Sequence, residues 1–360
     1  MVERNISNKA PIRIIVVDDS SVVRTLFRRK LSADPNIEVV GCAADAARAK
    51  IAIARLKPDV VTLDIEMPGA SGLQLLDMLM TNNPLPVVMV STLTRAGADA
   101  TLKALELGAV DYLAKPTGNS PINNSFFDLL IRKIRIAATA RLQHSTGPKT
   151  PSSRISNNPS KPRRAWPVPA LIAIGASTGG TEAIRKLLSH FPPNAPPTVV
   201  TQHMPPGFTE SFAERLNQTC KSTVCEARDR QRLLPGHVYI APGSGHLKVT
   251  DSPELGPICR IDEGPAVHHH KPSVDVMFDS VASSVGSQAL GLLLTGMGAD
   301  GAQGLLAMRR TGAHTVAQDE ASSIIYGMPR AAMQINAAVE QLPLDIIATQ
   351  CSLLATRQVA

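Results

Sequence analysis

One segment organises the second half of this chain: Leu171-Ile172-Ala173-Ile174-Gly175-Ala176-Ser177-Thr178-Gly179-Gly180. An apolar run of strand length leads directly into a glycine-flanked serine, and residues 181–188 have the apolar spacing of a helix. This strand–turn–helix places the Ser177 hydroxyl at a helix N-terminus, where unpaired N–H groups and the helix dipole favour a developing anion. The segment matches the pattern G-x-S-x-G, but a glycine turn that binds a nucleotide phosphate would look the same.

The rest of the second half indicates which side chains accompany this serine. Strand and helix patterns alternate over residues 170–358, which predicts a doubly wound, mainly parallel α/β domain. Buried strands are predicted at 171–174, 198–202 and 289–294. Ser177, His203 and Asp300 follow these strands, and functional groups of such sheets gather at the carboxyl ends of the strands. We therefore expect the three side chains to meet at one edge of one sheet.

The three residue types fit nucleophilic catalysis. An unperturbed serine hydroxyl is a poor nucleophile, so His203 would take its proton and Asp300 would orient the imidazole and stabilise the imidazolium. The order Ser–His–Asp differs from the Ser–Asp–His order of α/β-hydrolases and argues against that superfamily. The glycine-rich turn Gly296-Met297-Gly298 makes the Met297 N–H a candidate oxyanion donor, beside the amides of Ser177 and Thr178.

Two of the remaining histidines, His237 and His246, begin predicted strands. Two short strands at 237–240 and 246–249, separated by a glycine-containing segment, predict a hairpin. His190 is expected to cap the C-terminus of a helix. His268-His269-His270 suggests a metal site, but neighbouring strand residues point to opposite faces, so contact with the substrate is the more favoured role.

The first part of the chain, residues 11–140, also alternates strand and helix patterns. Strands are predicted at 12–17, 37–41, 59–63, 86–90 and 110–114. Strands separated by helices of this length pair in parallel through right-handed crossovers, so we expect a doubly wound five-stranded sheet. The polar residues at its strand ends are Asp18, Asp19, Asp64, Ser91 and Lys115.

These strand-end residues predict phosphoryl chemistry. Three carboxylates at one edge repel one another, and Mg²⁺, which prefers oxygen ligands, would compensate that repulsion. A carboxylate at this edge could attack a phosphoryl group, while the metal and Lys115 neutralise its oxygens and Ser91 donates a hydrogen bond.

Between the two domains, residues 141–169 are rich in serine, proline and asparagine, which predicts a flexible linker. This segment holds six basic and no acidic residues, so it accounts for most of the net charge of +7. Aromatic residues are only 3% of the chain, which leaves little for base stacking, and we expect no nucleic-acid binding. Trp166 is expected to dock the end of the linker onto the second domain.

Cysteine use and hydropathy indicate the compartment. The five cysteines are an odd number and scattered, which argues against a disulfide framework and a zinc site. The chain has no apolar run of bilayer length and no secretory signal pattern, so a cytoplasmic protein without membrane insertion is expected.

Residues 11–140 resemble the flavodoxin-like receiver domain of response regulators. The resemblance rests on Asp18-Asp19, Asp64 within Leu63-Asp64-Ile65-Glu66-Met67-Pro68-Gly69, Ser91 and Lys115-Pro116. It implies Mg²⁺ held by Asp18 or Asp19, by Asp64 and by the backbone carbonyl of Glu66. It also implies transfer of phosphate from a histidine kinase to Asp64 and a switch role for the aromatic Tyr112.

Nearly the whole chain resembles one family, the chemotaxis protein-glutamate methylesterases called CheB. The segments that carry the resemblance are 174–180, 202–205, 239–243, 272–276, 295–301 and 317–322. It implies that Ser177, His203 and Asp300 hydrolyse γ-glutamyl methyl esters of chemoreceptors, releasing methanol, and deamidate receptor glutamines. It also implies a CheA-type kinase as phosphodonor and no cofactor for the esterase reaction. The alternative is a regulator whose second domain binds a nucleotide or partner without catalysis.

Overall fold

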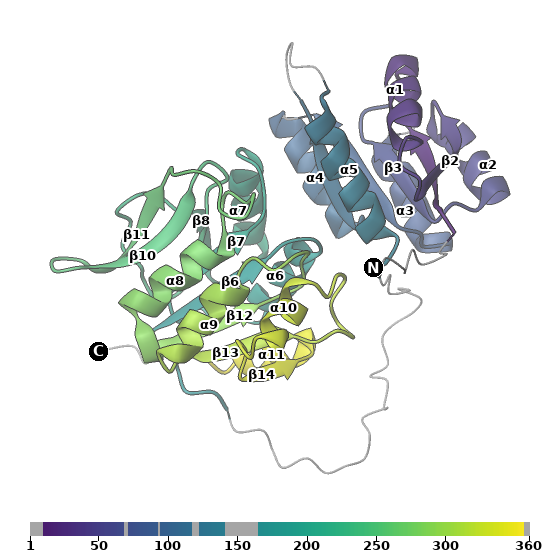
Figure 1. The fold of residues 1–360 in the computed structure, drawn as a ribbon. Coiled ribbons are helices and arrows are strands. Elements are labelled where there is room, and N and C mark those ends of the chain that lie inside the picture. Colours follow the sequence, from purple (N-terminus) through teal and green to yellow (C-terminus); the bar gives the residue numbers. More distant parts are fainter. Residues whose placement is uncertain (1–9, 68–70, 93, 117–121, 141–164, 356–360) are drawn as a thin grey trace. The chain divides into compact units, whose positions relative to one another are not determined.

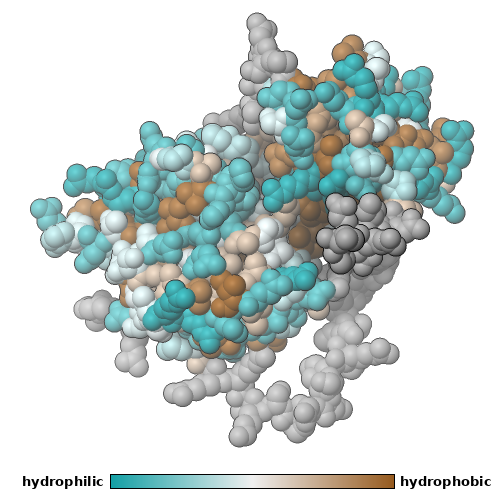
Figure 2. Space-filling model, viewed as in Figure 1, coloured by the Kyte–Doolittle hydropathy of each residue, from teal (hydrophilic) through white to brown (hydrophobic). Residues whose placement is uncertain are grey.

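The computed structural model describes residues 10–67, 71–92, 94–116, 122–140 and 165–355. It divides into two compact units, residues 1–144 and 145–360, and each is a sheet covered by helices (Figure 1). Most of the predicted linker lies outside the described residues. Charged and polar side chains dominate the visible faces of both units, with apolar ones scattered between them (Figure 2).

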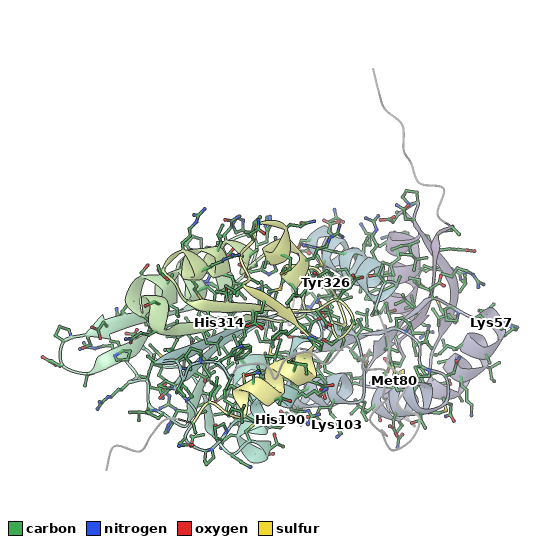
Figure 3. The ribbon with its side chains drawn as sticks, turned by 90° about the horizontal axis from the view of Figure 1, so that it is seen from below. Lys57, Met80, Lys103, His190, His314 and Tyr326 are labelled. Atoms are coloured by element: carbon green, nitrogen blue, oxygen red, sulfur yellow. The ribbon has the colours of Figure 1, made fainter. Side chains whose placement is uncertain are left out.

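The first unit is a parallel five-stranded sheet of order β2-β1-β3-β4-β5, which confirms the predicted α/β architecture. Its elements are β1 (Ile12–Val17), α1 (Ser21–Leu31), β2 (Ile37–Ala43), α2 (Ala46–Leu56), β3 (Val60–Asp64), α3 (Gly72–Asn82), β4 (Val87–Thr92), α4 (Arg95–Glu106), β5 (Asp111–Lys115) and α5 (Asn124–Ala137). Side chains of Ser, Asp, Thr or Asn cap the N-termini of these helices, and Lys57, in the left-handed conformation, ends α2 (Figure 3). Asp64, Ser91 and Lys115 lie within the last two residues of their strands rather than beyond them.

The second unit is built on a seven-stranded parallel sheet of order β14-β13-β12-β6-β7-β9-β8. Its first elements are β6 (Leu171–Ala176), α6 (Gly180–Leu188), β7 (Thr198–Gln202), α7 (Phe208–Thr219), β8 (Thr223–Glu226), β9 (His237–Ile240), β10 (His246–Ser252) and β11 (Gly256–Asp262). Then follow α8 (Val274–Ser284), the 3₁₀ helix η1 (Gly286–Gln288), β12 (Ala289–Leu293), α9 (Ala302–Arg310), β13 (His314–Gln318), α10 (Met328–Gln334), β14 (Glu340–Leu342) and α11 (Leu344–Cys351). The central strand β6 is fully buried, with β12 on one side and β7 on the other.

The predicted hairpin of residues 237–240 and 246–249 is wrong. β9 pairs in parallel with β7 and β8 inside the large sheet, and its last three residues are buried. β10 instead pairs antiparallel with β11, a strand that the sequence analysis did not find, in a separate two-stranded sheet. The local pattern misled because a glycine-containing connection is compatible with a tight turn, whereas the apolar face of β9 is buried by long-range pairing.

Trp166 docks onto the second unit, as expected. Trp166 is 8% exposed, and its ring lies 5.3 Å from the ring of His314, which begins β13 (Figure 3). The indole N–H donates to Glu340 at 3.2 Å, and the backbone N–H of Trp166 donates to the Gln350 side chain at 3.4 Å. These contacts fix where the chain enters the sheet, five residues before β6 begins.

Candidate active site and phosphorylation site

The turn after β6 presents Ser177 as the sequence predicts. Gly179, at φ 76°, precedes α6, and the Gly180 N–H donates to the Ser177 carbonyl at 2.7 Å. The positive φ falls on the glycine and not on the serine, because a left-handed conformation is costly for residues with a Cβ. A Cβ on Gly179 would also lie 2.8 Å from the side chain of Ile324, so the turn is tightly covered. Ser177 is half-buried at the edge of the sheet.

Ser177, His203 and Asp300 meet at the carboxyl ends of three adjacent strands, β12, β6 and β7. His203 Nδ1 lies 3.0 Å from Ser177 Oγ, and His203 Nε2 lies 2.7 Å from Asp300 Oδ2. The side chains of His203 and Asp300 are only 10% and 1% exposed. The chain order changes direction at β6, and such switch points are where doubly wound sheets place their sites.

Asp300 is held as a carboxylate by a cradle at the start of α8. Its two oxygens accept hydrogen bonds from Ser273 Oγ at 2.8 Å, Val274 N at 2.7 Å and Asp275 N at 3.1 Å. Burial raises the pKa of Asp300, but the hydrogen bonds from His203 and from these backbone groups outweigh it and leave the pKa well below its usual range. The sequence analysis missed this role of residues 273–275, because it depends on a contact between segments far apart in the chain.

The charge of Asp300 determines which nitrogen of His203 carries the proton. An ionised carboxylate only accepts hydrogen bonds, so the imidazole proton lies on Nε2 and is donated to Asp300. Nδ1 is then unprotonated and accepts the hydroxyl hydrogen of Ser177. In the familiar serine-protease arrangement the two nitrogens have the opposite partners, so the imidazole ring is reversed here.

Asp275 is a second buried carboxyl beside the triad. It accepts the N–H of Gly304 in α9 at 2.7 Å, and burial together with the neighbouring Asp300 charge raises the pKa of Asp275 to about 6. Between the unfolded value of about 4 and this folded value, the unfolded chain releases its proton first, so stability falls as pH rises. We expect Asp275→Asn, which still accepts the Gly304 N–H, to remove a penalty of order 1–3 kcal/mol at pH 8. Urea unfolding at pH 4 and pH 8 measures this, and an unchanged pH dependence in the variant would contradict it.

The oxyanion donors predicted from the sequence need one correction. The Ser177 N–H is not available, because it donates to the Thr295 carbonyl at 3.0 Å. The Met297 N–H forms no hydrogen bond within the residues that the structure describes, and Gly298, at φ 82°, lets the turn fold back beside Ser177. A Cβ on Gly296 would lie 2.8 Å from Ser177 Cβ, which shows how closely this turn approaches the serine. Thr178 is buried next to it, and its carbonyl accepts Thr295 Oγ1.

Two buried glutamines that the sequence analysis did not single out hold these turns together. Gln202, the last residue of β7, donates from Nε2 to the carbonyls of Ser177 at 2.9 Å and His203 at 3.4 Å. Gln318, the last residue of β13, accepts the Thr295 N–H at 2.8 Å and donates to the Ser322 carbonyl at 2.8 Å. Their position at strand ends was the available signal, because the same rule selected the triad.

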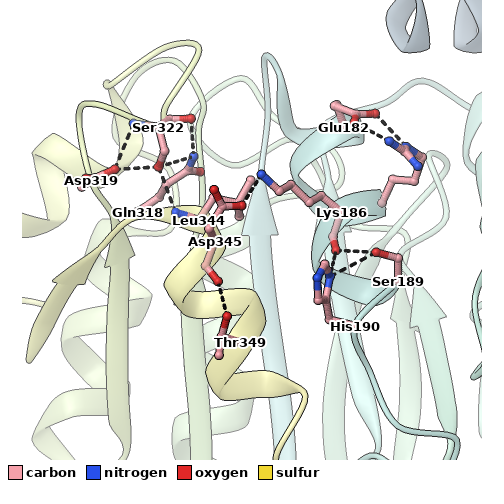
Figure 4. A network of polar contacts seen from close by, with 11 residues as sticks. Glu182, Lys186, Ser189, His190, Gln318, Asp319, Ser322, Leu344, Asp345 and Thr349 are labelled. Atoms are coloured by element: carbon pink, nitrogen blue, oxygen red, sulfur yellow. Dashed lines mark hydrogen bonds and ion pairs between the residues drawn. The ribbon is translucent and has the colours of Figure 1, made fainter. Parts of the chain in front are cut away.

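The other histidines lie outside the triad. His190 Nδ1 lies 2.8 Å from the Lys186 carbonyl at the end of α6, as predicted for a cap, and Lys186 also pairs with Asp345 of α11 (Figure 4). Among the described residues, the only cluster of potential metal ligands is in the first unit, so His268, His269 and His270 do not gather as a metal site. His270 instead stacks on His203.

The first unit carries an acidic edge at which Lys115 is partly buried. Lys115 Nζ lies 2.9 Å from Asp18 Oδ2 and 2.6 Å from Asp64 Oδ2. Burial raises the pKa of Asp64 to about 6, an effect that Asp18 reinforces and Lys115 opposes. Burial alone would lower the pKa of Lys115, but its bonds to Asp64 and Asp18 raise it, so the ammonium form is favoured. Ligand atoms of Asp18, Asp19 and Asp64 all lie within 4.8 Å of one another, which suits a hard divalent cation such as Mg²⁺.

The structure also places Ser91, Tyr112 and Glu66, the other residues predicted for the first unit. Ser91 is buried near the end of β4, and Tyr112 is buried in β5 with Lys133 Nζ 5.8 Å from its ring centre. Burial raises the pKa of Tyr112 well above its usual value, with the Asp111 charge adding to the rise. The Glu66 N–H donates to Asp64 Oδ1 at 3.4 Å, so the backbone of Glu66 lies next to the Asp64 carboxylate.

These two sites define a class of protein: a hydrolytic α/β domain joined to a receiver domain. The family model of CheB methylesterase matches residues 172–351, and that of the response regulator receiver domain matches residues 14–126. The chain belongs to the CheB methylesterase family.

Individual relatives agree with this assignment. A protein-glutamate methylesterase/protein-glutamine glutaminase of Xanthomonas campestris pv. campestris is 48% identical over 345 residues, 94% of this chain and 96% of the relative. One from Pseudomonas aeruginosa is 47% identical over 342 residues, 94% and 95% of the two chains. The crystal structure of the Thermotoga maritima CheB methylesterase catalytic domain is 34% identical, with a TM-score of 0.50, and covers 52% of this chain and 99% of that one.

Proposed function

We propose that Ser177, His203 and Asp300 carry out the hydrolysis that makes this chain a protein-glutamate methylesterase and protein-glutamine glutaminase. The observation that supports it is the unbroken path from Ser177 Oγ through the His203 ring to a buried, ionised Asp300. As Ser177 Oγ attacks the γ-carbonyl of a methylated glutamate, His203 Nδ1 takes the hydroxyl proton. Asp300 stabilises the imidazolium that results.

The two reactions share one acyl-enzyme. When the tetrahedral intermediate of a methyl ester collapses, the bond between the former carbonyl carbon and the methoxy oxygen breaks. Methanol leaves with the proton from His203 Nδ1. With a glutamine side chain the carbon–nitrogen bond breaks and ammonia leaves. Water then attacks the acyl-serine while His203 takes a proton from it. The bond between the acyl carbon and Ser177 Oγ breaks, His203 returns the proton to Oγ, and glutamate is released. The backbone N–H groups of Met297 and Thr178 are the proposed donors to the negatively charged oxygen.

The substrate is proposed to be the cytoplasmic part of methyl-accepting chemoreceptors, which places the protein in chemotaxis. No helix in the described part of the chain is long and apolar enough to cross a membrane. The direct test is methanol release from methylated receptors by the full-length protein. If methylated receptors release no methanol, this substrate assignment is wrong.

The receiver unit is proposed to accept phosphate on Asp64 from a CheA-type histidine kinase. Attack by an Asp64 oxygen on phosphorus breaks the bond from phosphorus to the kinase histidine and forms an acyl phosphate. Lys115, which already contacts Asp64, is placed to neutralise a phosphoryl oxygen, and Ser91 and Tyr112 are the proposed switch residues. Mg²⁺, held by Asp18 or Asp19, by Asp64 and by the Glu66 carbonyl, would supply further neutralisation when bound.

Phosphorylation is expected to raise the esterase rate through Asp64 alone. Asp64→Asn has no carboxylate oxygen to attack phosphorus, so a small acyl phosphate donor should increase methanol release by the native protein and leave the variant at its basal rate. The matched control is Asp77→Asn on α3, which changes the same functional group outside this edge. An equal increase in native protein and Asp64→Asn would show that another residue is phosphorylated or that the donor acts on the catalytic unit.

A further inference from the structure

The His203 ring has a neighbour on its face as well as in its plane. The ring of His270 lies parallel to it, with centroids 3.9 Å apart and an interplanar angle of 8°. The in-plane hydrogen bonds to Ser177 and Asp300 use both nitrogens of His203. We propose that His270 is a positioning residue whose stacked ring holds the His203 imidazole in the plane of the triad and stabilises it as an imidazolium. This inference rests on the proposed role of His203 as the base.

The backbone around His270 is shaped to present this one ring. Val267 and His270 exchange two backbone hydrogen bonds, at 3.0 and 2.9 Å, which close a two-residue turn. Its central residues, His268 and His269, have φ of 49° and 67° and are exposed. Turns of this type favour asparagine and glycine, because other residues pay conformational energy in the left-handed region. His268 and His269 adopt this conformation despite its cost. The turn places the His270 ring against His203, while His268 and His269 are exposed.

A buried histidine fixes the ends of the same loop. His246, only 2% exposed, accepts the Ser273 N–H on Nδ1 at 3.0 Å, so its proton lies on Nε2 and is donated to the Pro265 carbonyl at 3.0 Å. Ser273 Oγ in turn donates to Asp300. His246 therefore links the two ends of the loop that contains His270, and Ser273 at one of these ends also binds the Asp300 carboxylate.

The stack matters most after proton transfer. His203 carries a positive charge only once it has taken the Ser177 proton, and an aromatic face attracts a cation placed against it. The stabilisation therefore grows between the ground state and the transition state, so it should appear in kcat rather than in KM. A permanent positive charge at position 270 would repel the imidazolium and should have the opposite effect.

The test compares four single variants of the full-length protein. His270→Phe keeps an uncharged aromatic face, His270→Leu keeps bulk without one, and His270→Arg offers a flat group with a fixed charge. His269→Asn, on the same turn, is the matched control, because asparagine tolerates the left-handed region and residue 269 faces solvent. Each variant is assayed for methanol release from methylated receptors. The second readout is the rate at which phenylmethanesulfonyl fluoride sulfonylates Ser177, forming the oxygen–sulfur bond as fluoride leaves.

We expect His270→Leu to lower both kcat and the sulfonylation rate by about 3- to 30-fold with KM unchanged, from the usual strength of such contacts. His270→Arg should lower kcat and the sulfonylation rate further. In His270→Phe and His269→Asn both rates should stay within about 3-fold of the native values. A loss confined to KM, with sulfonylation unchanged, would overturn the proposal in favour of substrate contact. Equal losses in His270→Phe and His270→Leu would also overturn it. Sulfonylation of Ser177→Ala at the native rate would instead refute the proposed nucleophile.

Discussion

Ser177→Ala is expected to reduce methanol release by about 10⁴–10⁶-fold, the usual cost of removing the nucleophile of such a triad. The variant keeps the Gly179 turn and the hydrogen bonds made by the Ser177 backbone, because neither involves Oγ. The fold should therefore survive while the acyl-enzyme can no longer form. Methanol release and glutamine deamidation should be lost together, since both pass through the same acyl-serine.

Ser189→Ala is the matched control for this experiment. Ser189 lies at the exposed C-terminal end of α6. Its hydroxyl donates to the Lys186 carbonyl at 2.8 Å and lies 3.2 Å from His190 Nδ1 (Figure 4). It should retain the native rate, with at most a small loss of stability. A Ser177→Ala protein with undiminished activity would support the alternative class, in which the second unit binds a nucleotide or partner through the glycine turn.

Asp300→Asn is expected to lower kcat by about 10⁴-fold, as neutralising a triad aspartate typically does. If the amide N–H₂ faces His203, the imidazole must accept on Nε2 and carry its proton on Nδ1, which then points at Ser177 and cannot act as a base. The amide also lacks one of the acceptor oxygens that bind Ser273 and the start of α8. Steady-state kinetics of methanol release measures the loss.

Asp300→Asn is also expected to change how the stability of the fold depends on pH. The folded pKa of Asp300 is depressed, so its contribution is present above the unfolded value of about 4 and is lost as pH falls through the folded value. Acid unfolding of the native protein should show this loss, and Asp300→Asn should lack it. Asp251→Asn, at an exposed aspartate of β10, is the control and should keep both the activity and the acid dependence. Near-native kcat in Asp300→Asn would show that the carboxylate does not orient His203.

Most of the predicted strands and site residues follow from strand periodicity and from the rule that sites gather at the carboxyl ends of parallel strands. β1 and β7 begin and end at the predicted residues, because continuous apolar runs mark them locally. Ser177, His203 and Asp300 could be placed at one sheet edge because parallel strands all present their carboxyl ends there. The strand β11 could not be predicted with its partner, since pairing β10 with it rather than with β9 depends on which faces become buried.

The sequence by itself determined the two α/β units, the sheet edge at which Ser177, His203 and Asp300 meet, and the acidic edge of the receiver, because periodicity and residue type are local properties of the chain. Only the tertiary structure decided that Nδ1 of His203 faces Ser177, that the start of α8 binds Asp300, and that His270 stacks on the His203 ring. Each of these contacts joins segments distant along the chain, and its geometry depends on how helices and loops pack against the sheet.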